Sequence, residues 1–273
     1  MEKIIRLQDG ARLRAEIEGK GEAILFVHAD FLDGGMWRRV MGKFAGNYRV
    51  ARFDKQGYGA SSPALGPICR RRELAAVIAA LDLGPLHLVG CSNGGQSSLD
   101  FALESPGLVR SLSLVNSSPS GFVLEGAPPP EILEMIAAFE RGDFKRASEL
   151  QVQIWFDGPG RDPATLDPHR LAARAEAAAM NRICVDRNTF FIADSSPLDP
   201  LDPPAIKRLA EVRVPTLVVS GVLDYGENCR ASRILSNGIP GARFVEMENC
   251  AHVPPMEEPE LFAGILEEFL NSR

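Results

Sequence analysis

Residues 86–95 read Leu-His-Leu-Val-Gly-Cys-Ser-Asn-Gly-Gly, and Ser92 within them decides how the chain is interpreted. A short apolar strand over Leu86–Val89 leads straight into a Gly-x-Ser-x-Gly pattern, and a run that favours a helix follows to Glu104. The small residues on both sides allow a sharp turn, which strains the serine and exposes its hydroxyl at the edge of a sheet. We therefore predict that Ser92 is a nucleophile and that the N–H group of Asn93, at the helix start, faces an oxyanion.

The length and composition of the chain are those of a single α/β domain over residues 1–273. Of the 273 residues, 45% are hydrophobic and 24% are charged, a balance that argues against disorder. The net charge of −6 comes without a basic stripe, so we expect neither nucleic acid nor an anionic membrane as a partner. The charged N-terminus is unlike a signal peptide, and no run approaches the ~18 apolar residues of a membrane span. We therefore expect a cytoplasmic protein.

Five cysteines are spread along the chain without a C-x-x-C pair. A disulfide scaffold or a zinc site needs closer, paired spacing, so we expect free thiols and no metal. Cys91 adjoins Ser92, but the turn presents only one side chain, and we interpret Cys91 as a small buried apolar residue. The cysteines are Cys69, Cys91, Cys184, Cys229 and Cys250.

Alternating strand-like and helix-like segments predict the fold class. Asp9-Gly10 is a hairpin signal between the first two strands, and from the third onward the strands are apolar on both faces, as covered parallel strands are. We expect an α/β fold with a mostly parallel, doubly wound, eight-stranded sheet that begins antiparallel. The expected strands are Ile4–Leu7, Leu13–Glu18, Ala23–His28, Tyr48–Phe53, Leu86–Val89, Ser111–Val115, Thr216–Ser220 and Arg243–Met247. The expected helices between them are Arg72–Leu81, Gly94–Leu103, Asn228–Leu235 and Glu258–Leu270.

The alternation is interrupted once, between Asn116 and Pro215. This segment of almost a hundred residues contains no convincing strand, and an unstructured loop of that length is improbable in a compact domain. We predict a helical lid at about residues 119–212, placed over the edge where open α/β sheets bind their ligands. Its expected helices are Glu131–Glu140, Phe144–Phe156 and Asp167–Met180.

A serine hydroxyl needs a base, normally a histidine that a carboxylate orients, and the chain has four histidines. His87 lies inside the strand before Ser92, and His169 lies at a solvated helix start within the expected lid. His28 ends the third strand, and we interpret it as a brace for the loop that follows. His252 lies between the last strand and the last helix, in a loop that reaches the same edge of the sheet. We predict that His252 is the catalytic base.

The carboxylate is expected after the preceding strand. Asp224 lies at the end of that strand, a few residues past Gly221, and we predict that it orients the histidine. Glu227 and Glu248 are the alternatives. The resulting order Ser, Asp, His differs from that of the chymotrypsin-like and subtilisin-like proteases.

The loop after the third strand is expected to supply the second oxyanion donor. The backbone N–H of Asp30 is our candidate, with that of Phe31 as the alternative. A carboxylate aimed at an oxyanion would oppose the developing charge. We therefore expect the Asp30 side chain to turn toward the loop and accept hydrogen bonds from backbone N–H groups near Asp33–Gly35. The other interpretation is that it recognises a polar or cationic part of a substrate.

With these residues located, the chain resembles the α/β-hydrolases, in the lidded esterase and lactonase branch that includes 3-oxoadipate enol-lactonases, proline iminopeptidases and C–C bond hydrolases. Asp54–Ser61 is similar to the family's D-x-x-G-x-G-x-S loop, and Trp155–Pro159 resembles a W-x-D-G-P segment of small-substrate members. Trp37 also falls where related sequences carry tryptophan. The chain departs at Ala29, where the family usually has glycine, and at Gln56, where one version of the loop has arginine.

The resemblance implies a serine hydrolase that cleaves a small carboxylic ester or lactone through an acyl-enzyme, without a cofactor. Serine at position 92 argues against dehalogenase and epoxide-hydrolase chemistry, which uses aspartate. Alternatives on the same fold are C–C bond hydrolysis, cleavage of an amide at an N-terminal proline, and perhydrolysis; a non-catalytic receptor is a further one. Phe31, Trp155 and Phe156 are the expected substrate-pocket residues. The oligomeric state is open, with a homodimer as one candidate.

Overall fold

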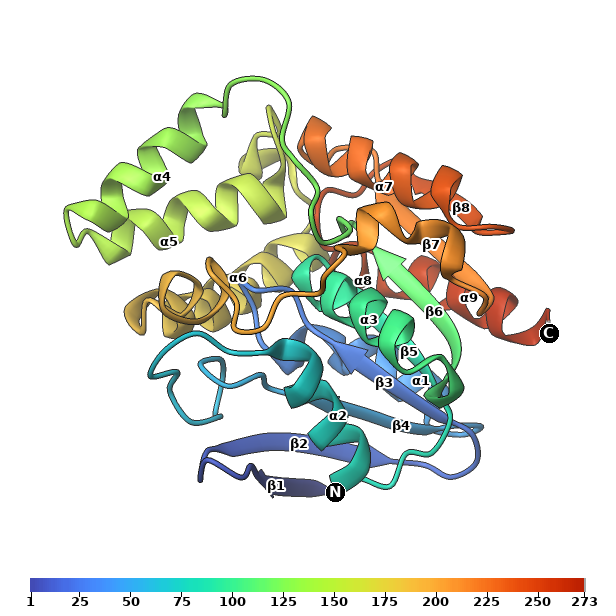
Figure 1. The fold of residues 1–273 in the computed structure, drawn as a ribbon. Helices are drawn as coiled ribbons and strands as arrows, with labels where there is room; N and C mark the ends of the chain where they lie inside the picture. Colours follow the sequence, from blue (N-terminus) through green and yellow to red (C-terminus); the bar gives the residue numbers. More distant parts are fainter. Residues whose placement is uncertain (273) are drawn as a thin grey trace.

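The computed structural model describes residues 1–272 and places an eight-stranded sheet at the centre of the molecule (Figure 1). The strands follow the order β1-β2-β4-β3-β5-β6-β7-β8 across the sheet. β2 runs antiparallel to both of its neighbours, and the other pairs are parallel, which confirms the expected antiparallel start. The strands are β1 Glu2–Arg6, β2 Arg12–Glu18, β3 Ala23–Val27, β4 Arg49–Phe53, β5 Leu86–Cys91, β6 Val109–Val115, β7 Thr216–Gly221 and β8 Arg243–Met247.

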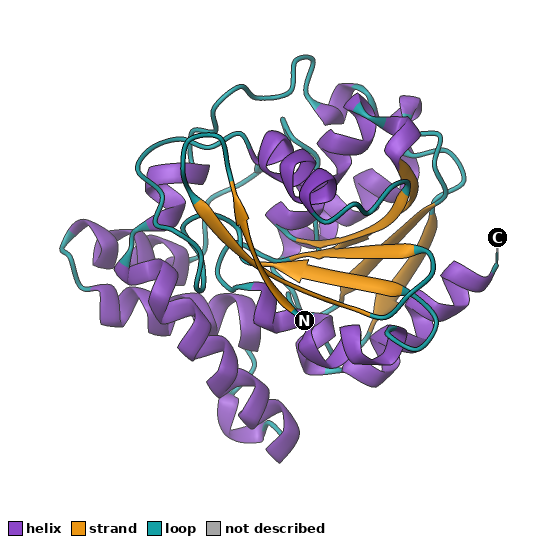
Figure 2. Cartoon of the chain, turned by 90° about the horizontal axis from the view of Figure 1, so that it is seen from below, coloured by secondary structure: helices purple, strands orange, loops and turns teal. Residues whose placement is uncertain are grey.

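Helices cover both faces of the sheet (Figure 2). Two short helices, α1 and α8, were not expected from the sequence, because seven and four residues are too few to display a helical period. The nine α-helices of the described chain are α1 Arg38–Phe44, α2 Arg70–Ala80, α3 Asn93–Glu104, α4 Pro130–Glu140, α5 Phe144–Val152, α6 Pro168–Asp186, α7 Gly226–Gly238, α8 Pro254–Glu257 and α9 Pro259–Asn271. None of them is long and apolar enough to cross a membrane.

The sheet separates two hydrophobic cores, and β3 contributes to both. Its five residues are all buried, and successive side chains point to opposite faces. Ile24 and Phe26 pack in the core under α1 and α9, whereas Leu25 and Val27 pack in the core under α2 and α3. A continuous apolar run therefore forms a central strand here, because water reaches neither face.

The segment between β6 and β7 is helical and lies beyond the carboxyl edge of the sheet (Figure 1). We call residues 119–212 the helical insertion. Its helices differ from expectation at two ends: α5 stops at Val152 and continues as a π-helical turn over Gln153–Asp157, and α6 continues to Asp186. Asp157 is fully buried and forms a bidentate ion pair with Arg174, which joins the turn to α6. The W-x-D-G-P resemblance thus falls on a packing element of the insertion.

Candidate active site

Ser92 occupies a strained turn between β5 and α3. Its backbone has φ 54° and ψ −128°, a conformation that residues with a side chain rarely adopt. The turn is closed by small neighbours: a Cβ on Gly90 would lie 2.5 Å from the Gly94 carbonyl oxygen, and a Cβ on Gly94 would lie 2.5 Å from that of His28. A Cβ on Gly95 would lie 1.9 Å from Ser117 Oγ. The glycines of the motif are therefore required by close backbone approach, as expected for a strained nucleophile turn.

His252 and Asp224 lie together next to this turn. His252 Nδ1 lies 2.7 Å from Asp224 Oδ2, and both side chains are buried. Since an ionised carboxylate only accepts hydrogen bonds, the imidazole carries its proton on Nδ1 and leaves Nε2 to accept one. Asp224 also accepts hydrogen bonds from the N–H of Tyr225 at 2.7 Å and from Asn228 Nδ2 at 3.0 Å. These contacts fix the orientation of the carboxylate and of the ring.

Two asparagines that the sequence analysis did not single out support this pair. Asn228, on α7, donates to Asp224 and lies 3.2 Å from His252 Nδ1. Asn116, directly after β6, donates to the carbonyl of Ala251 at 2.8 Å and accepts from the N–H of Gly221 at 2.8 Å. Asn116 thereby ties together the loops that carry the histidine and the aspartate. Neither role has a sequence signature. Asn116 joins segments that are remote along the chain, and Asn228 lies four residues after Asp224 but reaches His252 only in the folded chain.

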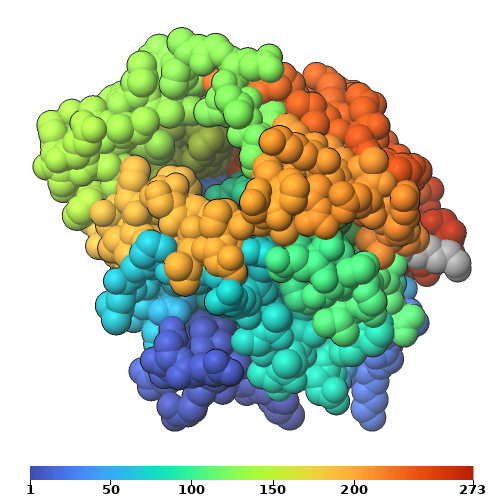
Figure 3. Space-filling view, in the orientation of Figure 1, coloured from blue at the N-terminus to red at the C-terminus, as the bar shows by residue number. Residues whose placement is uncertain are grey.

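Ser92 and His252 line one cavity of about 390 Å³, which we call the serine cavity. Within residues 1–272, no hydrogen bond joins the Ser92 hydroxyl to His252, an arrangement common in enzymes without a bound substrate. Figure 3 shows a hollow that opens between the parts of the helical insertion. The apolar side of the cavity is formed mainly by the insertion, through Leu124, Met135, Ile136, Phe139, Trp155, Phe190 and Phe191.

The three expected pocket residues have different environments. Phe31 and Trp155 line the serine cavity, and the Trp155 ring lies 5.1 Å from that of His252, measured between centroids. Phe156 does not line it: its side chain is fully buried in a hydrophobic core, so the prediction is wrong for this residue. Adjacent residues on a helical turn point about 100° apart, and the sequence did not indicate which of the two aromatic rings faces the cavity.

The N–H groups expected to form an oxyanion site border the same cavity. Asn93 is the first residue of α3, where a helix leaves its N–H groups without partners inside the helix. Asp30 lies on the loop after β3, and His28 braces that loop: its Nδ1 lies 2.8 Å from the carbonyl of Ala29, and its Nε2 accepts the N–H of Lys55 at 3.0 Å. Burial, together with the Lys55 charge, lowers the pKa of His28 well below its usual value, so the brace is neutral.

The Asp30 carboxylate does not turn toward residues 33–35, so this expectation is wrong. One oxygen pairs with the buried ammonium of Lys55, and the other accepts a hydrogen bond from Asn93 Nδ2 at 2.7 Å. The N–H groups of the loop have other acceptors: Gly35 donates to Asp33 and Gly34 to Asp54. Lys55 lies 25 positions further along the chain, and an isolated buried ammonium is so unfavourable that it requires a carboxylate nearby. The ion pair therefore determines the orientation of Asp30.

The remaining histidine and carboxylate candidates lie elsewhere. His87 is buried in β5 with its Nδ1 2.7 Å from Ser111 Oγ, and His169 is exposed in the first turn of α6. Glu227 forms an ion pair with Arg230, and Glu248 is exposed. The five cysteines are free thiols, and Cys91 is buried as expected. In the described part of the chain, no cluster of three or more His, Cys, Asp or Glu side chains could hold a metal ion.

Comparison with known proteins identifies the family. The model of the alpha/beta hydrolase family matches residues 24–265, and the chain belongs to that family. It is 28% identical over 257 residues to the pimeloyl-[acyl-carrier protein] methyl ester esterase of Aeromonas hydrophila, covering 92% of this chain and 96% of the relative. It is 26% identical over 282 residues to the 2-hydroxy-6-oxononadienedioate/2-hydroxy-6-oxononatrienedioate hydrolase of Cupriavidus pinatubonensis, covering 99% and 95%.

A solved structure confirms the fold expected from the resemblance. The enol-lactonase from Burkholderia xenovorans LB400 superposes with a TM-score of 0.75 at 20% identity, covering 96% of this chain and 98% of that one. The eight-stranded, mostly parallel sheet with helices on both faces is therefore the α/β-hydrolase fold. The relatives named here are hydrolases that act on different bonds, so the comparisons give a hydrolase family and not a substrate.

Proposed function

We propose that this α/β-hydrolase is a serine hydrolase that cleaves a small carboxylic ester or lactone through an acyl-enzyme. The observation that carries the proposal is the 2.7 Å contact between His252 and Asp224, beside the cavity that Ser92 enters from its strained turn. A nucleophile, a base and an orienting carboxylate in this arrangement define the chemistry of acyl transfer. No metal or cofactor is needed for it.

In the first half of the proposed reaction, Nε2 of His252 takes the Ser92 proton while Oγ attacks the substrate carbonyl carbon. The proposed step requires the serine hydroxyl to come within hydrogen-bond distance of Nε2. Asp224 stabilises the imidazolium that forms, and its hydrogen bonds from Tyr225 and Asn228 hold the carboxylate in place. The N–H groups of Asp30 and Asn93 bind the oxyanion.

In the second half, the tetrahedral intermediate collapses and the carbon–oxygen bond of the ester breaks. His252 returns its proton to the departing alcohol, and the acyl group stays on Ser92. Water then attacks the acyl carbonyl with the same base and the same oxyanion donors, which releases the acid and restores the serine. The helical insertion, proposed here as a lid, limits access of bulk water to the cavity.

An ester or lactone fits the serine cavity better than the anionic substrate of the hydrolase from C. pinatubonensis. The name of that relative describes a dioate, which carries two carboxylates. No lysine or arginine lines the serine cavity, and Asp30 is the carboxylate among its lining residues. A dicarboxylate held within this cavity would therefore have no cationic partner in the lining, which is unfavourable. C–C bond hydrolysis remains the second candidate because of this relative.

Replacement of the nucleophile tests the proposal. Ser92→Ala is expected to reduce hydrolysis of p-nitrophenyl acetate about 10³-fold or more, because only binding and the oxyanion donors remain. The unfolding midpoint should stay near that of the unaltered protein, which separates loss of chemistry from loss of fold. A fluorophosphonate probe should label Ser92, and peptide mapping would locate the label. Unchanged turnover in the variant, or labelling at another residue, would refute the proposal.

A further inference from the structure

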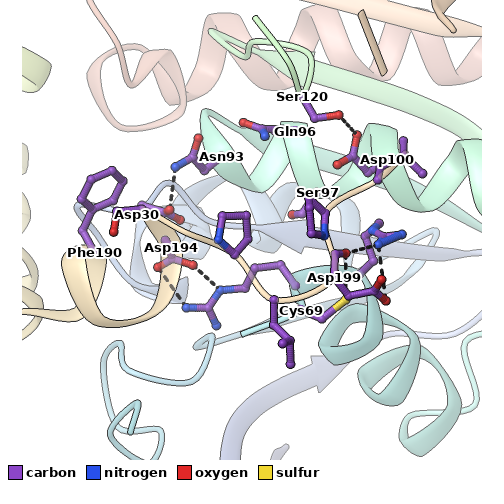
Figure 4. Close-up of a pocket in the computed structure, with 17 residues that line it drawn as sticks. Asp30, Cys69, Asn93, Gln96, Ser97, Asp100, Ser120, Phe190, Asp194 and Asp199 are labelled. Atoms are coloured by element: carbon purple, nitrogen blue, oxygen red, sulfur yellow. Dashed lines mark hydrogen bonds and ion pairs between the residues drawn. The ribbon is translucent and has the colours of Figure 1, made fainter. Parts of the chain in front are cut away.

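A second cavity of about 340 Å³ lies alongside α3 and adjoins the serine cavity (Figure 4). We call it the α3 cavity. Asp30, Asn93 and Phe190 line both cavities, so the two meet where Asn93 Nδ2 donates to the Asp30 carboxylate at 2.7 Å. These three side chains therefore form the boundary between the two cavities, which a long substrate bound at Ser92 has to pass to reach the α3 cavity.

One face of α3 forms a polar wall of this cavity. Asn93, Gln96, Ser97 and Asp100 line it, and their spacing of three, four and seven residues places them on the same side of the helix. The helix rises 1.5 Å per residue, so Asp100 lies roughly 12 Å from Ser92 along the axis. This row of four polar residues thus extends from the residue next to Ser92 to the buried carboxylate of Asp100.

The opposite wall of the cavity is the segment 195–201, which belongs to the end of the helical insertion. Ser120 holds this end against α3: its hydroxyl donates to Asp100 at 2.7 Å and accepts the N–H of Ala205 at 2.8 Å. The position of Asp100 is therefore fixed by the fold, with one carboxylate oxygen used by Ser120.

Asp100 differs from the other carboxylates that line the α3 cavity. Each of the others has a cationic partner: Lys55 for Asp30, Arg70 for Asp194 and Arg72 for Asp199. Asp100 is only 7% exposed, and among residues 1–272 it has no ion-pair partner within 4 Å. Burial raises its pKa to about 6, so the carboxylate is mostly ionised at neutral pH. Arg71 also lines the cavity and favours the ionised carboxylate, but its own ion pairs are with Glu104 and Asp199. A buried carboxylate that no cation contacts directly is stabilised when a ligand supplies one.

His252 determines which part of a substrate can occupy the α3 cavity. Under the proposed function, the leaving oxygen must lie beside His252 to receive its proton, and His252 lines the serine cavity but not the α3 cavity. The acyl chain points away from the leaving group at the tetrahedral carbon. A substituent in the α3 cavity is therefore part of the acyl group.

We propose that the α3 cavity binds the far end of the substrate's acyl chain and selects chains that end in a protonated amino group, with Asp100 as the partner of the ammonium. The substrate class is then an ester of an ω-amino acid, or a lactone whose acyl chain carries a terminal amino group, with a chain that spans roughly 12 Å from the carbonyl carbon. This inference rests on the proposed function. It assigns Asp100 as a specificity-determining residue that takes no part in the reaction at Ser92.

The test compares methyl esters that share a chain length and differ at the far end, with the acid product quantified by mass spectrometry. We expect kcat/KM to be roughly tenfold higher for an ammonium end than for a methyl end, as a hydrogen bond to a charged group provides. A carboxylate end should be the poorest. Asp100→Asn keeps an oxygen for Ser120 and removes the charge, so it should abolish the ammonium preference and leave p-nitrophenyl acetate hydrolysis unchanged.

Asp199→Asn is the matched control. Asp199 lines the same cavity but is half exposed and paired with Arg72, so its loss should leave the ammonium preference intact. A second variant, Gln96→Phe, fills the cavity and should lower kcat/KM for long chains of every kind without affecting the acetate ester. Equal rates for ammonium and methyl ends would overturn the proposal, as would an ammonium preference that survives in Asp100→Asn. Acetate turnover that does not depend on Ser92 would instead refute the proposed function.

Discussion

Asp30 and Asp224 both lie at the carboxyl edge of the sheet, where β5 and β6 separate their strands, and their carboxylates have different partners. Asp224 follows β7, is fully buried, and contacts the imidazole of His252. Asp30 follows β3, is nearly as buried, and contacts the ammonium of Lys55. The imidazole gains a proton only during the proposed reaction, whereas the ammonium is charged throughout. Asp224 can therefore stabilise a charge that develops, and the charge of Asp30 is already balanced.

The difference explains how an aspartate is tolerated beside the proposed oxyanion site. A free carboxylate next to the N–H of Asp30 would raise the barrier to oxyanion formation. The Lys55 ammonium balances this charge, and Asn93 Nδ2 donates a hydrogen bond to the second carboxylate oxygen. The pair is thus a structural support of the oxyanion loop, and Asp224 is the candidate for direct participation. The contrast predicts that substitution of Asp224 mainly reduces catalysis, whereas substitution of Asp30 mainly reduces stability.

Asp224→Asn should lower kcat for p-nitrophenyl acetate by about 10⁴-fold. The amide would hold the imidazole with Nδ1 as an acceptor, so Nε2 would carry a proton and could not act as a base. Glu227→Gln is the control, because Glu227 is paired with Arg230 and should lose little activity. Comparison of kcat for the two variants by steady-state kinetics decides whether Asp224 or Glu227 orients the histidine. A larger loss in Glu227→Gln would show that the carboxylate has been assigned incorrectly.

Asp30→Asn should reduce the free energy of unfolding by about 3–5 kcal/mol, because it leaves the Lys55 ammonium buried without a partner. The double variant Asp30→Asn, Lys55→Met removes that charge and should recover most of the loss. Urea unfolding of the single and double variants measures the coupling. If the double variant is no more stable than Asp30→Asn alone, the ion pair does not explain the orientation of Asp30.

The preference for an ammonium end should be pH dependent, and its expected change is about tenfold or less. Asp100 has a pKa of about 6, raised by burial and by Glu104 and lowered by its bond from Ser120 and the charges of Arg71 and Arg208. Lowering the pH from about 7 to 5 protonates the carboxylate, so the ratio of kcat/KM for ammonium and methyl ends should fall. The ratio compares two substrates at the same pH, so effects common to both substrates cancel.

A ratio that stays constant over this range would show that Asp100 does not titrate in the cavity or does not contact the chain end. In Asp100→Asn the ratio should be flat near unity at every pH. A slope that persists in this variant would assign the effect to another group that faces the cavity.

The direction of the Phe156 side chain and the role of Asn228 could not be predicted from local sequence patterns. Trp155 and Phe156 are adjacent aromatic residues in a predicted helix, and only Trp155 reaches the serine cavity. The structure forms a π-helical turn there, which changes the direction of each side chain. Asn228 supports Asp224 from α7, yet an asparagine in a helix has no pattern that distinguishes it from a surface residue. The burial of Phe156 depends on packing against distant segments, and the role of Asn228 depends on His252 lying next to it in the folded chain.

The α/β-hydrolase fold and the turn that carries Ser92 could be predicted from local sequence, because the strand, turn and helix are contiguous and the close approach at positions 90, 94 and 95 requires glycine. The order of the predicted strands and loops also indicated Asp224 and His252. The contact between Asp30 and Lys55 and the polar face of α3 along a second cavity are visible only in the folded chain. The direction of a long or charged side chain depends on which distant group balances its charge or fills its space, and no local spacing contains that information.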